Sequence, residues 1–275
     1  MAVSAITRVP FAMPNMPARP IYTLSDRDRR LLAYDALKVW IKPDNDNVRR
    51  SGKLLRVAGR KGYMGLTSDD AIVVGTGMAG NAKPVIKFPG GVTGSGELPF
   101  HVPNFILNNS GYFAAIVIKW DAAMATSGVA YQFFAAGVDG SPTDIAFYML
   151  NNALNLQHGD LTCSTSSVGF VAGNCYLVWA SYDPVTKTPM VGVNSVAPRN
   201  WTGTPPTLEA AGINREVVLG GKFNPGKTAG TQMFLGDIAE AFICDEQMVT
   251  ADRDILRAEL LGDIASLYGA DFTLA

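Results

Sequence analysis

The chain has 275 residues, of which 48% are hydrophobic and 17% are charged, and its formal net charge is −1. This length suits one large domain or two small ones, and the hydrophobic content is sufficient for a sizeable core. The near-neutral charge, without basic clusters interleaved with aromatic residues, argues against nucleic-acid binding. No apolar run approaches about 18 residues, so membrane insertion is not expected.

The charge is unevenly distributed along the chain. Residues 1–60 hold 12 Lys or Arg and 5 Asp, a net charge of +7, whereas residues 61–275 hold 11 Lys or Arg and 19 Asp or Glu, a net charge of −8. Such asymmetry can mark a basic segment that meets an acidic partner. The alternative is that Arg27, Arg29 and Arg30 only solvate one face of a helix.

Residues 1–24 contain four prolines, a density that disfavours both helix and central strand, and they lack the apolar core of a secretion signal. We therefore expect an extended arm. A purely disordered tail would be polar, whereas this segment carries apolar side chains suited to docking on the sandwich or on a neighbour. The expected docking residues of this assembly arm are Phe11, Met13, Met16 and Ile21.

Residues 25–38 are the first predicted helix, with Ser25 suited to the N-cap. Pro43 ends the segment that follows, and residues 44–47 are predicted as a turn. Calcium binding by this Asp-Asn-Asp-Asn stretch is the weaker alternative, because the glycine and final glutamate of an EF-hand loop are missing. The apolar side chains expected on one face of the helix are Leu31, Tyr34 and Leu37.

From about residue 53 onward, short apolar runs alternate with Gly, Asn, Asp and Pro clusters, which is typical of a sandwich or jelly roll. Residues 113–118 are apolar at odd and even positions alike, so they should form a central strand covered on both faces. The predicted strands cover residues 54–57, 63–66, 71–75, 84–88, 97–102, 111–120, 128–137, 144–150, 175–183, 189–195, 216–221 and 232–244.

Residues 250–268 are the second predicted helix, with Thr250 at the N-cap and Gly269 placed to end it. The apolar residues at helical spacing that should pack on the sandwich are Ile255, Leu256, Leu260, Ile264 and Leu267.

Residues 217–269 therefore read as two apolar strands, a Gly/Asn/Pro turn and one helix. This order resembles the last segment of the concanavalin A-like, laminin-G-like jelly-roll family, where a GG…F.GDIAE strand pair precedes a short helix ending in LYG or KYG. Residues 36–44 resemble the opening strand of that family. Residues 81–91 resemble a later strand, although Pro89 replaces the usual acidic residue. The resemblance spans about residues 37–269 and implies a two-sheet sandwich that is often glycan-binding, sometimes a hydrolase and frequently a virion or cell-surface module.

The predicted fold is thus an all-β, two-sheet jelly-roll sandwich of the concanavalin A-like type over residues 39–275. It follows an extended arm (residues 1–24) and a short helix (residues 25–38), and it ends in the helix over residues 250–268.

A retaining glycosidase needs two carboxylates about 5–5.5 Å apart, and residues i and i+2 of a strand share a face. The nearest candidates are Asp237 and Glu240. They are three residues apart, so they face opposite sides unless a bulge intervenes. We interpret Asp237 as bonding backbone amides in a turn and Glu240 as solvated, so we predict no catalytic residues and no enzyme.

Other chemistries are also disfavoured. His101 and His158 lack the setting of a catalytic triad, and residues 158–160 are predicted as a hairpin turn. Residues 75–80, GTGMAG, lack the G-K-[ST] end of a phosphate loop and are predicted as a turn.

The three cysteines also lack the spacing of a metal site. We expect Cys163, Cys175 and Cys244 to be buried thiols, with a Cys163–Cys175 bridge as the alternative.

Glycan recognition requires an exposed aromatic ring with amides nearby, and predicted loops carry both. Trp120, Trp179 and Tyr131 lie in predicted strands and are expected in the core. The candidate glycan-binding residues in loops are Trp201, Asn200, Asn151, Asn152 and Asn224.

The favoured functional interpretation is a non-enzymatic structural or docking protein of a larger assembly, namely a phage capsid or tail component in a virion assembled in the host cytoplasm. Its expected partners are other virion proteins, further copies of itself as a homo-oligomer, and a glycan. No cofactor or metal is expected. The first alternative is a lectin module for host attachment, and the second is a divergent glycoside hydrolase.

Overall fold

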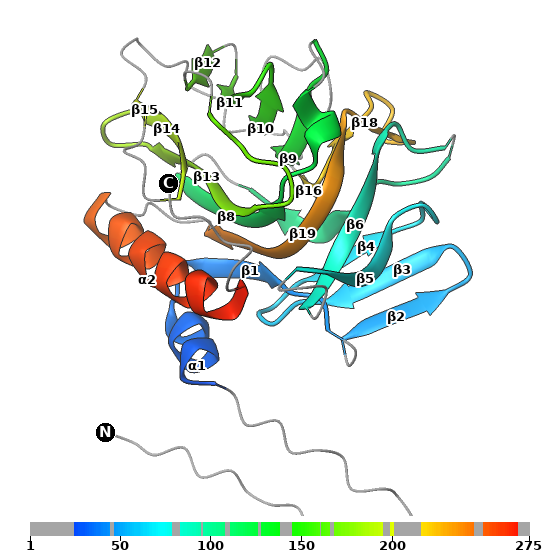
Figure 1. Cartoon of the computed structure of the whole chain (residues 1–275), viewed down its shortest axis with the longest axis horizontal. Helices are drawn as coiled ribbons and strands as arrows, with labels where there is room; N and C mark the ends of the chain where they lie inside the picture. The colour runs from blue at the N-terminus through cyan, green and yellow to red at the C-terminus, as the bar shows by residue number, and fades with distance from the viewer. Residues whose placement is uncertain are drawn as a thin grey trace, which may run out of the picture.

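The computed structural model of the chain has two antiparallel β-sheets packed face to face, with two helices on the outside (Figure 1). It confirms the predicted all-β sandwich. The predicted arm over residues 1–24, with Phe11, Met13, Met16 and Ile21, lies outside the described residues. The structure describes residues 25–44, 47–78, 83–94, 96–107, 111–125, 128–137, 145–159, 161–165, 168–194, 199–200, 216–244 and 250–268.

The first sheet has eight described strands in the order β15-β14-β13-β8-β19-β6-β5, with β1 paired to the end of β19. Its long central strands β8, β13 and β19 come from the most continuous apolar runs of the sequence. Their bounds and those of their neighbours are β1 Leu37–Ile41, β5 Val73–Met78, β6 Lys83–Gly91, β8 Tyr112–Lys119, β13 Cys175–Asp183, β14 Thr188–Val193, β15 Arg199–Asn200 and β19 Met233–Cys244.

The second sheet has nine described strands in the order β12-β11-β10-β9-β16-β7-β4-β3-β2. A separate two-stranded ribbon, β17 (Lys222–Phe223) with β18 (Gly230–Thr231), lies between β16 and β19 in the chain. The strands of the second sheet are β2 Val48–Ser51, β3 Leu54–Ala58, β4 Met64–Thr67, β7 His101–Ile106, β9 Tyr131–Ala136, β10 Ile145–Leu150, β11 Ala153–His158, β12 Leu161–Ser164 and β16 Glu216–Leu219.

The main core fills the space between the two sheets. Aromatic side chains dominate it, and Phe133 lies between Phe147 and Phe234, with ring centroids 5.1 and 5.5 Å away. Strand β8 is buried on both faces: Ile116 and Ile118 face the other sheet, whereas Phe113 and Val117 face outward into a second apolar cluster. This confirms the prediction of a central strand covered on both sides.

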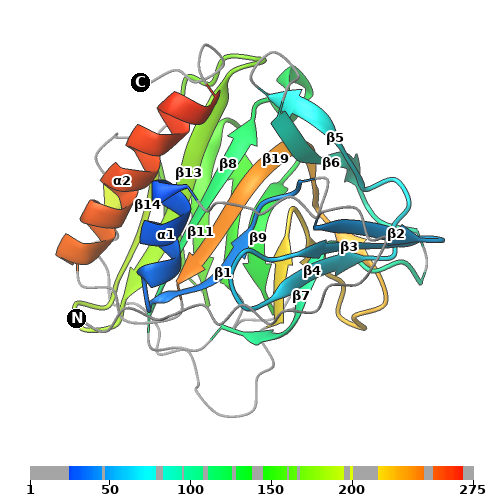
Figure 2. The same cartoon turned by 90° about the horizontal axis from the view of Figure 1, so that it is seen from below.

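The second cluster exists because helices cover the outer face of the first sheet. Helix α1 (Asp26–Ala33) and helix α2 (Thr250–Tyr268) lie over the part of the sheet formed by β13, β14 and β1, and neither crosses β5 or β6 (Figure 2). Trp40, Trp179 and Phe242 are the large side chains packed beneath them. The outer face therefore has a covered part and an open part.

Helix α1 is shorter than predicted. Ser25 caps it as expected, since its Oγ accepts from the Asp28 amide at 3.1 Å, but the helix ends at Ala33 rather than at residue 38. Leu37 instead begins β1, which pairs with Cys244 at the end of β19. Pairing and burial of an apolar five-residue strand override the helical spacing of the local sequence.

Helix α2 has the predicted bounds. Leu256 and Leu260 are buried against the sheet as expected, and Leu267 packs partly buried beside them. Ile255 was assigned to the same face, but it is 53% exposed.

Each predicted strand has an observed counterpart, and β13 matches its predicted bounds. The two-residue strands β15, β17 and β18 were not predicted, and three longer strands were also missed: β2, β11 and β12. Their sequences alternate apolar residues with Arg, Asn, Gln, Ser and Thr, so they resemble turns and loops. Residues 75–78 were assigned to a turn, but they belong to β5.

The three cysteines are buried thiols that no disulfide joins to one another, as expected. Cys163 faces the core between the sheets, whereas Cys175 lies in the cluster under the helices, so the first sheet separates them and the alternative bridge does not form. Among the described residues, neither helix is long and apolar enough to cross a membrane.

Candidate functional site

A pocket of about 430 Å³ is lined in part by β5, β6 and β19. Strands β5 and β6 belong to the part of the first sheet that the helices leave uncovered (Figure 2). Strands β5, β6 and β19 supply one wall, and the residues after β8 and before β13 supply the other. Its volume is within the range of small-molecule sites. The charged side chains that line it are Lys87, Lys119, Asp121 and Asp237.

Asp237 lies in the middle of this pocket because of strand register. It pairs with Lys87 on β6 and with Lys119 on β8, so the three residues form one row across the sheet. Lys87 Nζ lies 3.4 Å from each carboxylate oxygen, and Lys119 Nζ donates to the Gly77 carbonyl at 2.8 Å. The Asp237 side chain is 16% exposed. Burial raises the pKa of Asp237, and the attraction of Lys87 offsets this only in part.

Two glycines shape the floor of the pocket. At Gly77 an added Cβ would lie 2.0 Å from Asp237 Oδ2, so the carboxylate rests directly against the backbone of β5. Gly236 has φ +134°, and a Cβ there would lie 3.0 Å from the Lys119 carbonyl oxygen. The glycines predicted to make a turn thus include one that gives the carboxylate its space.

Trp120 forms a wall of the pocket rather than an open platform. Its ring is stacked on Phe170, with centroids 4.8 Å apart and planes 19° apart, and the residue is 4% exposed. Backbone bonds tie it to the residues before β13 in the same wall, because its amide donates to Asn174 and its carbonyl accepts from Gly173. Asp121 follows, and its carboxylate accepts from the Ala123 amide at the start of the short 3-10 helix Ala122–Ala125.

Three residues beyond Asp237, Glu240 lies under the helices and is fully buried. Its carboxylate accepts from Arg27 Nη2 at 2.9 Å, from Trp40 Nε1 at 3.1 Å and from the Tyr268 hydroxyl at 2.8 Å, and Lys42 Nζ is 3.4 Å away. Burial opposes ionisation, but the attraction of Arg27 and Lys42 outweighs it, so the pKa of Glu240 lies below its ordinary value. Burial, together with the negative charge of Glu240, holds the pKa of Tyr268 well above its ordinary value.

These contacts correct two expectations about β19. A bulge between Ile238 and Glu240 restores the parity, so Asp237 and Glu240 both face outward rather than to opposite sides. Glu240 is not solvated, and Asp237 contacts a lysine rather than turn amides. The two carboxylates still do not form one site, because Glu240 is enclosed by partners from α1, α2 and β1.

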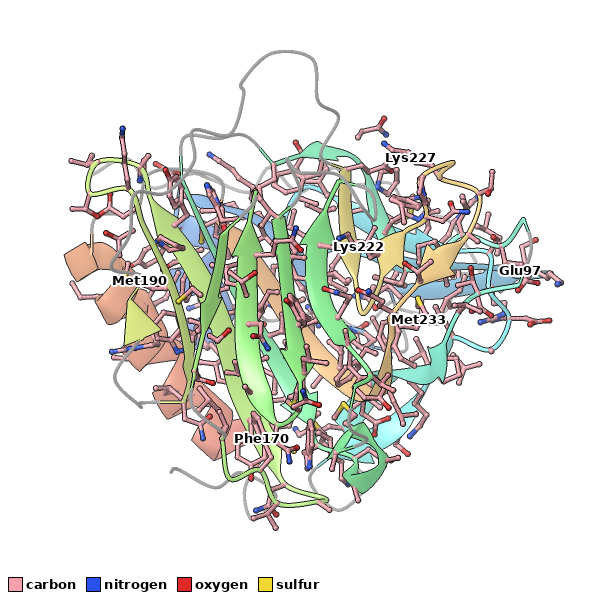
Figure 3. All side chains as sticks on the ribbon, turned by 90° about the horizontal axis from the view of Figure 1, so that it is seen from above. Glu97, Phe170, Met190, Lys222, Lys227 and Met233 are labelled. Carbon is pink, nitrogen blue, oxygen red and sulfur yellow. The ribbon has the colours of Figure 1, made fainter. Side chains whose placement is uncertain are left out.

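The predicted glycan-binding asparagines build two separate turns. Asn151 and Asn152 have φ of 51° and 60° in the β10–β11 turn, and Asn151 Oδ1 accepts from the Gly128 amide. The Asn152 carbonyl accepts from Val168, close to Phe170. Asn224 accepts from the amides of Thr228 and Ala229 in the β17–β18 loop, close to Lys227. Figure 3 shows Phe170 and Lys227 near opposite ends of the sandwich.

The structure thus does not bring these asparagines together. Asn200 lies in β15 opposite Met190, and Trp201 lies outside the described residues. Trp120, Trp179 and Tyr131 are buried, as predicted.

The histidines have structural surroundings. His158 ends β11, stacks on Tyr182 with centroids 3.9 Å apart and shares a hydrogen bond with the Tyr112 hydroxyl at 3.1 Å. His101 Nδ1 lies 2.9 Å from the Pro99 carbonyl oxygen. As expected for a hairpin, His158 pairs with Leu161.

Two groups of acidic residues are candidates for a cation site. Asp44 and Asn47 exchange reciprocal bonds between side chain and amide, which are those of the predicted turn. Asp69, Asp70 and Glu97 are close enough to share a metal ion, but Lys53 pairs with Glu97 and lies 3.9 Å from Asp70.

Comparison with known proteins gives a fold and no family. No family model and no curated protein sequence matches the chain. Trypanosoma rangeli sialidase in complex with sialic acid matches with a TM-score of 0.54 and 11% sequence identity, over 89% of this chain and 38% of the sialidase. The same sialidase with a difluorinated KDN compound matches with a TM-score of 0.52 and 10% identity, over 87% and 34%. A CBM40 module of Ruminococcus gnavus sialidase bound to α2,3-sialyllactose reaches a TM-score of only 0.43 at 17% identity, over 63% and 95%.

The chain therefore spans little more than a third of the length of the sialidases it matches. The likeness, at this identity, concerns the fold alone. It overturns the prediction that the chain is not an enzyme, because the solved structures that share the fold are named as enzymes. The fold gives no ground for excluding catalysis.

Proposed function

We propose that the chain is a carbohydrate-binding β-sandwich and that the pocket around Asp237 is its binding site. The observation that carries this proposal is the mixture of donors and acceptors in the pocket: the ammonium groups of Lys87 and Lys119 and the carboxylates of Asp121 and Asp237. Each sugar hydroxyl both donates and accepts, as hydroxyl groups do, so a lining of this mixture suits it.

The surroundings of the pocket support the same conclusion. Gly77 and Gly236 contribute backbone to its lining and Trp120 is part of its side, so a ligand meets polar groups beside an apolar wall. Such a combination is typical of small-molecule sites. The resemblance to a family whose members often bind glycans agrees with it, although fold alone does not select a ligand.

The test is a glycan array followed by titration of any bound saccharide, with paired variants in the 3-10 helix. Ala122 lines the pocket, whereas its exposed neighbour Ala123 does not. Ala122→Trp should fill the pocket and abolish binding, and Ala123→Trp should bind like the natural chain. Thermal unfolding of both variants checks that they fold.

Trp201→Ala separates this pocket from the site expected from the sequence. Binding that survives Ala122→Trp and is lost in Trp201→Ala would move the site to the loop residues. Failure of a broad saccharide panel to bind would refute the proposed function itself. The assembly arm lies outside the described residues, and neither the structure nor the comparisons bear on the homo-oligomer or the virion assignment, so all three stay predictions.

A further inference from the structure

We infer that the pocket selects a neutral saccharide by a pair of adjacent hydroxyl groups, which donate to the two carboxylate oxygens of Asp237. This inference rests on the proposed function and names the class of sugar and the group that reads it. A neutral saccharide differs from the sialic acid and the KDN compound in the sialidase complexes. The inference follows from the charges and distances in this chain.

The first argument is the unused accepting capacity of Asp237. An ionised carboxylate has about four lone-pair positions. Among the described residues its hydrogen-bonding contacts are two of 3.4 Å, both from the single ammonium group of Lys87. Charge-assisted bonds between an ammonium group and a carboxylate are typically about 2.7–2.9 Å, so both contacts are weak. A mostly buried carboxylate in this state requires further donors, and the open side from which they can come is the pocket.

The second argument is that the carboxylate is held in place. Oδ2 rests against Gly77, and the flanking strands β6 and β8 fix the backbone on both sides. A fixed pair of acceptor oxygens matches two hydroxyl groups on neighbouring ring carbons, which donate in parallel. A single hydroxyl group would leave one oxygen without a donor.

The third argument concerns the charge of the ligand. The pocket holds two lysines and two aspartates, and both ammonium groups have partners in the protein: Lys87 with Asp237, and Lys119 with the Gly77 carbonyl. The carboxylate of an acidic sugar would have to compete with these partners for the ammonium groups while approaching Asp121 and Asp237. Arginine, whose planar group suits a ligand carboxylate, is absent from the described lining. A neutral sugar avoids these costs.

The inference is tested by titrating the full chain with two sets of methyl glycosides. The neutral set contains methyl glucoside, mannoside and galactoside, each with deoxy analogues that lack one hydroxyl group. The acidic set contains methyl glucuronide and the methyl glycoside of N-acetylneuraminic acid. We expect binding within the neutral set, and a loss of about tenfold or more when a deoxy analogue removes one hydroxyl of the pair, because a hydrogen bond to a charged group is worth about that factor.

Asp237→Asn should weaken the neutral ligand by about tenfold or more, since the amide offers one acceptor oxygen in place of two. Asp70→Asn is the matched control, because Asp70 is an exposed aspartate outside the pocket, and it should change affinity less than about twofold. Affinity should also fall on acidification, beginning above the ordinary pKa of an aspartate, because burial raises the pKa of Asp237.

The outcomes separate the two proposals. Stronger binding of the acidic set that is abolished by Ala122→Trp would overturn this inference and leave the proposed function intact. Neutral binding that Asp237→Asn leaves unchanged would overturn the role of Asp237. If neither set nor the wider array binds, the proposed function fails first.

Discussion

Strand β19 carries one carboxylate in each part of the outer face of the first sheet. Glu240 lies in the covered part, where two helices and β1 enclose it, and four side chains donate to it or neutralise it. Asp237 lies three residues earlier in the open part, where one lysine approaches it at 3.4 Å. The bulge between them makes both face outward. They therefore lie on the same strand and the same face of the sheet, but different side chains surround them.

The difference shows how to separate a structural carboxylate from one available to a ligand. The acceptor positions of Glu240 are filled and its pKa is lowered. Its hydrogen bonds and ion pairs hold α1 and α2 against the sheet. Asp237 has acceptor positions that no described residue fills, and its pKa is raised. A ligand that donates hydrogen bonds to it would therefore stabilise its ionised form. Removing each carboxylate should therefore have opposite consequences for stability and binding.

The largest expected effect is on stability in the covered part. Glu240→Gln removes the charge that compensates Arg27 and Lys42 and should lower the free energy of unfolding by about 3–5 kcal/mol, as for other broken buried ion pairs. Urea unfolding at neutral pH measures it. Glu259→Gln, on helix α2 without a described partner in the sheet, is the control and should stay within about 0.5 kcal/mol. Equal values for the two variants would contradict the role of Glu240.

The same contacts predict how stability depends on pH. The folded pKa of Glu240 is lowered, so the unfolded chain binds its proton more readily. The stabilisation is therefore complete above the unfolded pKa of about 4.3 and is lost as pH falls through the lower folded value. Melting temperatures between neutral and strongly acidic pH should fall less steeply for Glu240→Gln than for the natural chain. Parallel curves would show that another group controls acid unfolding.

A smaller effect is expected at Tyr268, which joins the end of α2 to the same carboxylate. Tyr268→Phe keeps the ring and removes the 2.8 Å hydrogen bond, so it should cost about 1.5 kcal/mol, at the low end for bonds to charged groups, since other donors remain. Tyr63→Phe is a suitable control, because no hydrogen bond of the Tyr63 hydroxyl occurs among the described residues, and it should be nearly neutral in urea unfolding. A loss as large in the control would assign the effect to the ring rather than to the bond.

The sequence predicts the helices and strands better than it predicts the surroundings of Asp237 and Glu240. Strand β13 follows directly from a largely apolar nine-residue run, and helix α2 from a capped apolar repeat. The ion pair of Arg27 with Glu240 joins residues 213 apart in the chain, and no local pattern marks either as buried. No local sequence pattern marks the bulge in β19, so the sequence alone could not show that Asp237 and Glu240 face the same side of the sheet.

The pocket is harder still to predict, since its parts come from four strands. Gly77, Lys87, Lys119 and Asp237 meet only once the register of β5, β6, β19 and β8 is set. Gly77 in particular was assigned to a turn from composition. Its requirement for glycine arises from a carboxylate 160 residues later in the sequence.

That requirement gives the next prediction, for binding rather than stability. Gly77→Ala places a methyl group 2.0 Å from Asp237 Oδ2 and should displace the carboxylate, weakening a bound saccharide by about tenfold. Gly75→Ala, two residues earlier in β5, meets only the flexible end of Lys87 at 2.9 Å and should bind nearly normally. Titration of both variants with the bound saccharide decides whether binding depends on the position of the Asp237 carboxylate. Equal losses in the two variants would mean that any added methyl group in β5 disturbs the pocket.

The smallest expected effect is on the stability of the open part. Asp237 has a raised folded pKa, so its ionised form costs stability at neutral pH, and that cost disappears as pH falls through the folded value. Asp237→Asn removes the charge at all pH values, and Lys87, whose side chain is 40% exposed, remains solvated without it. The free energy of unfolding should therefore stay the same or rise by less than about 1 kcal/mol, in the same urea measurement in which Glu240→Gln loses several. A large loss in Asp237→Asn would mean that Asp237, like Glu240, holds the fold together, and the case for a ligand in the pocket would lose its main support.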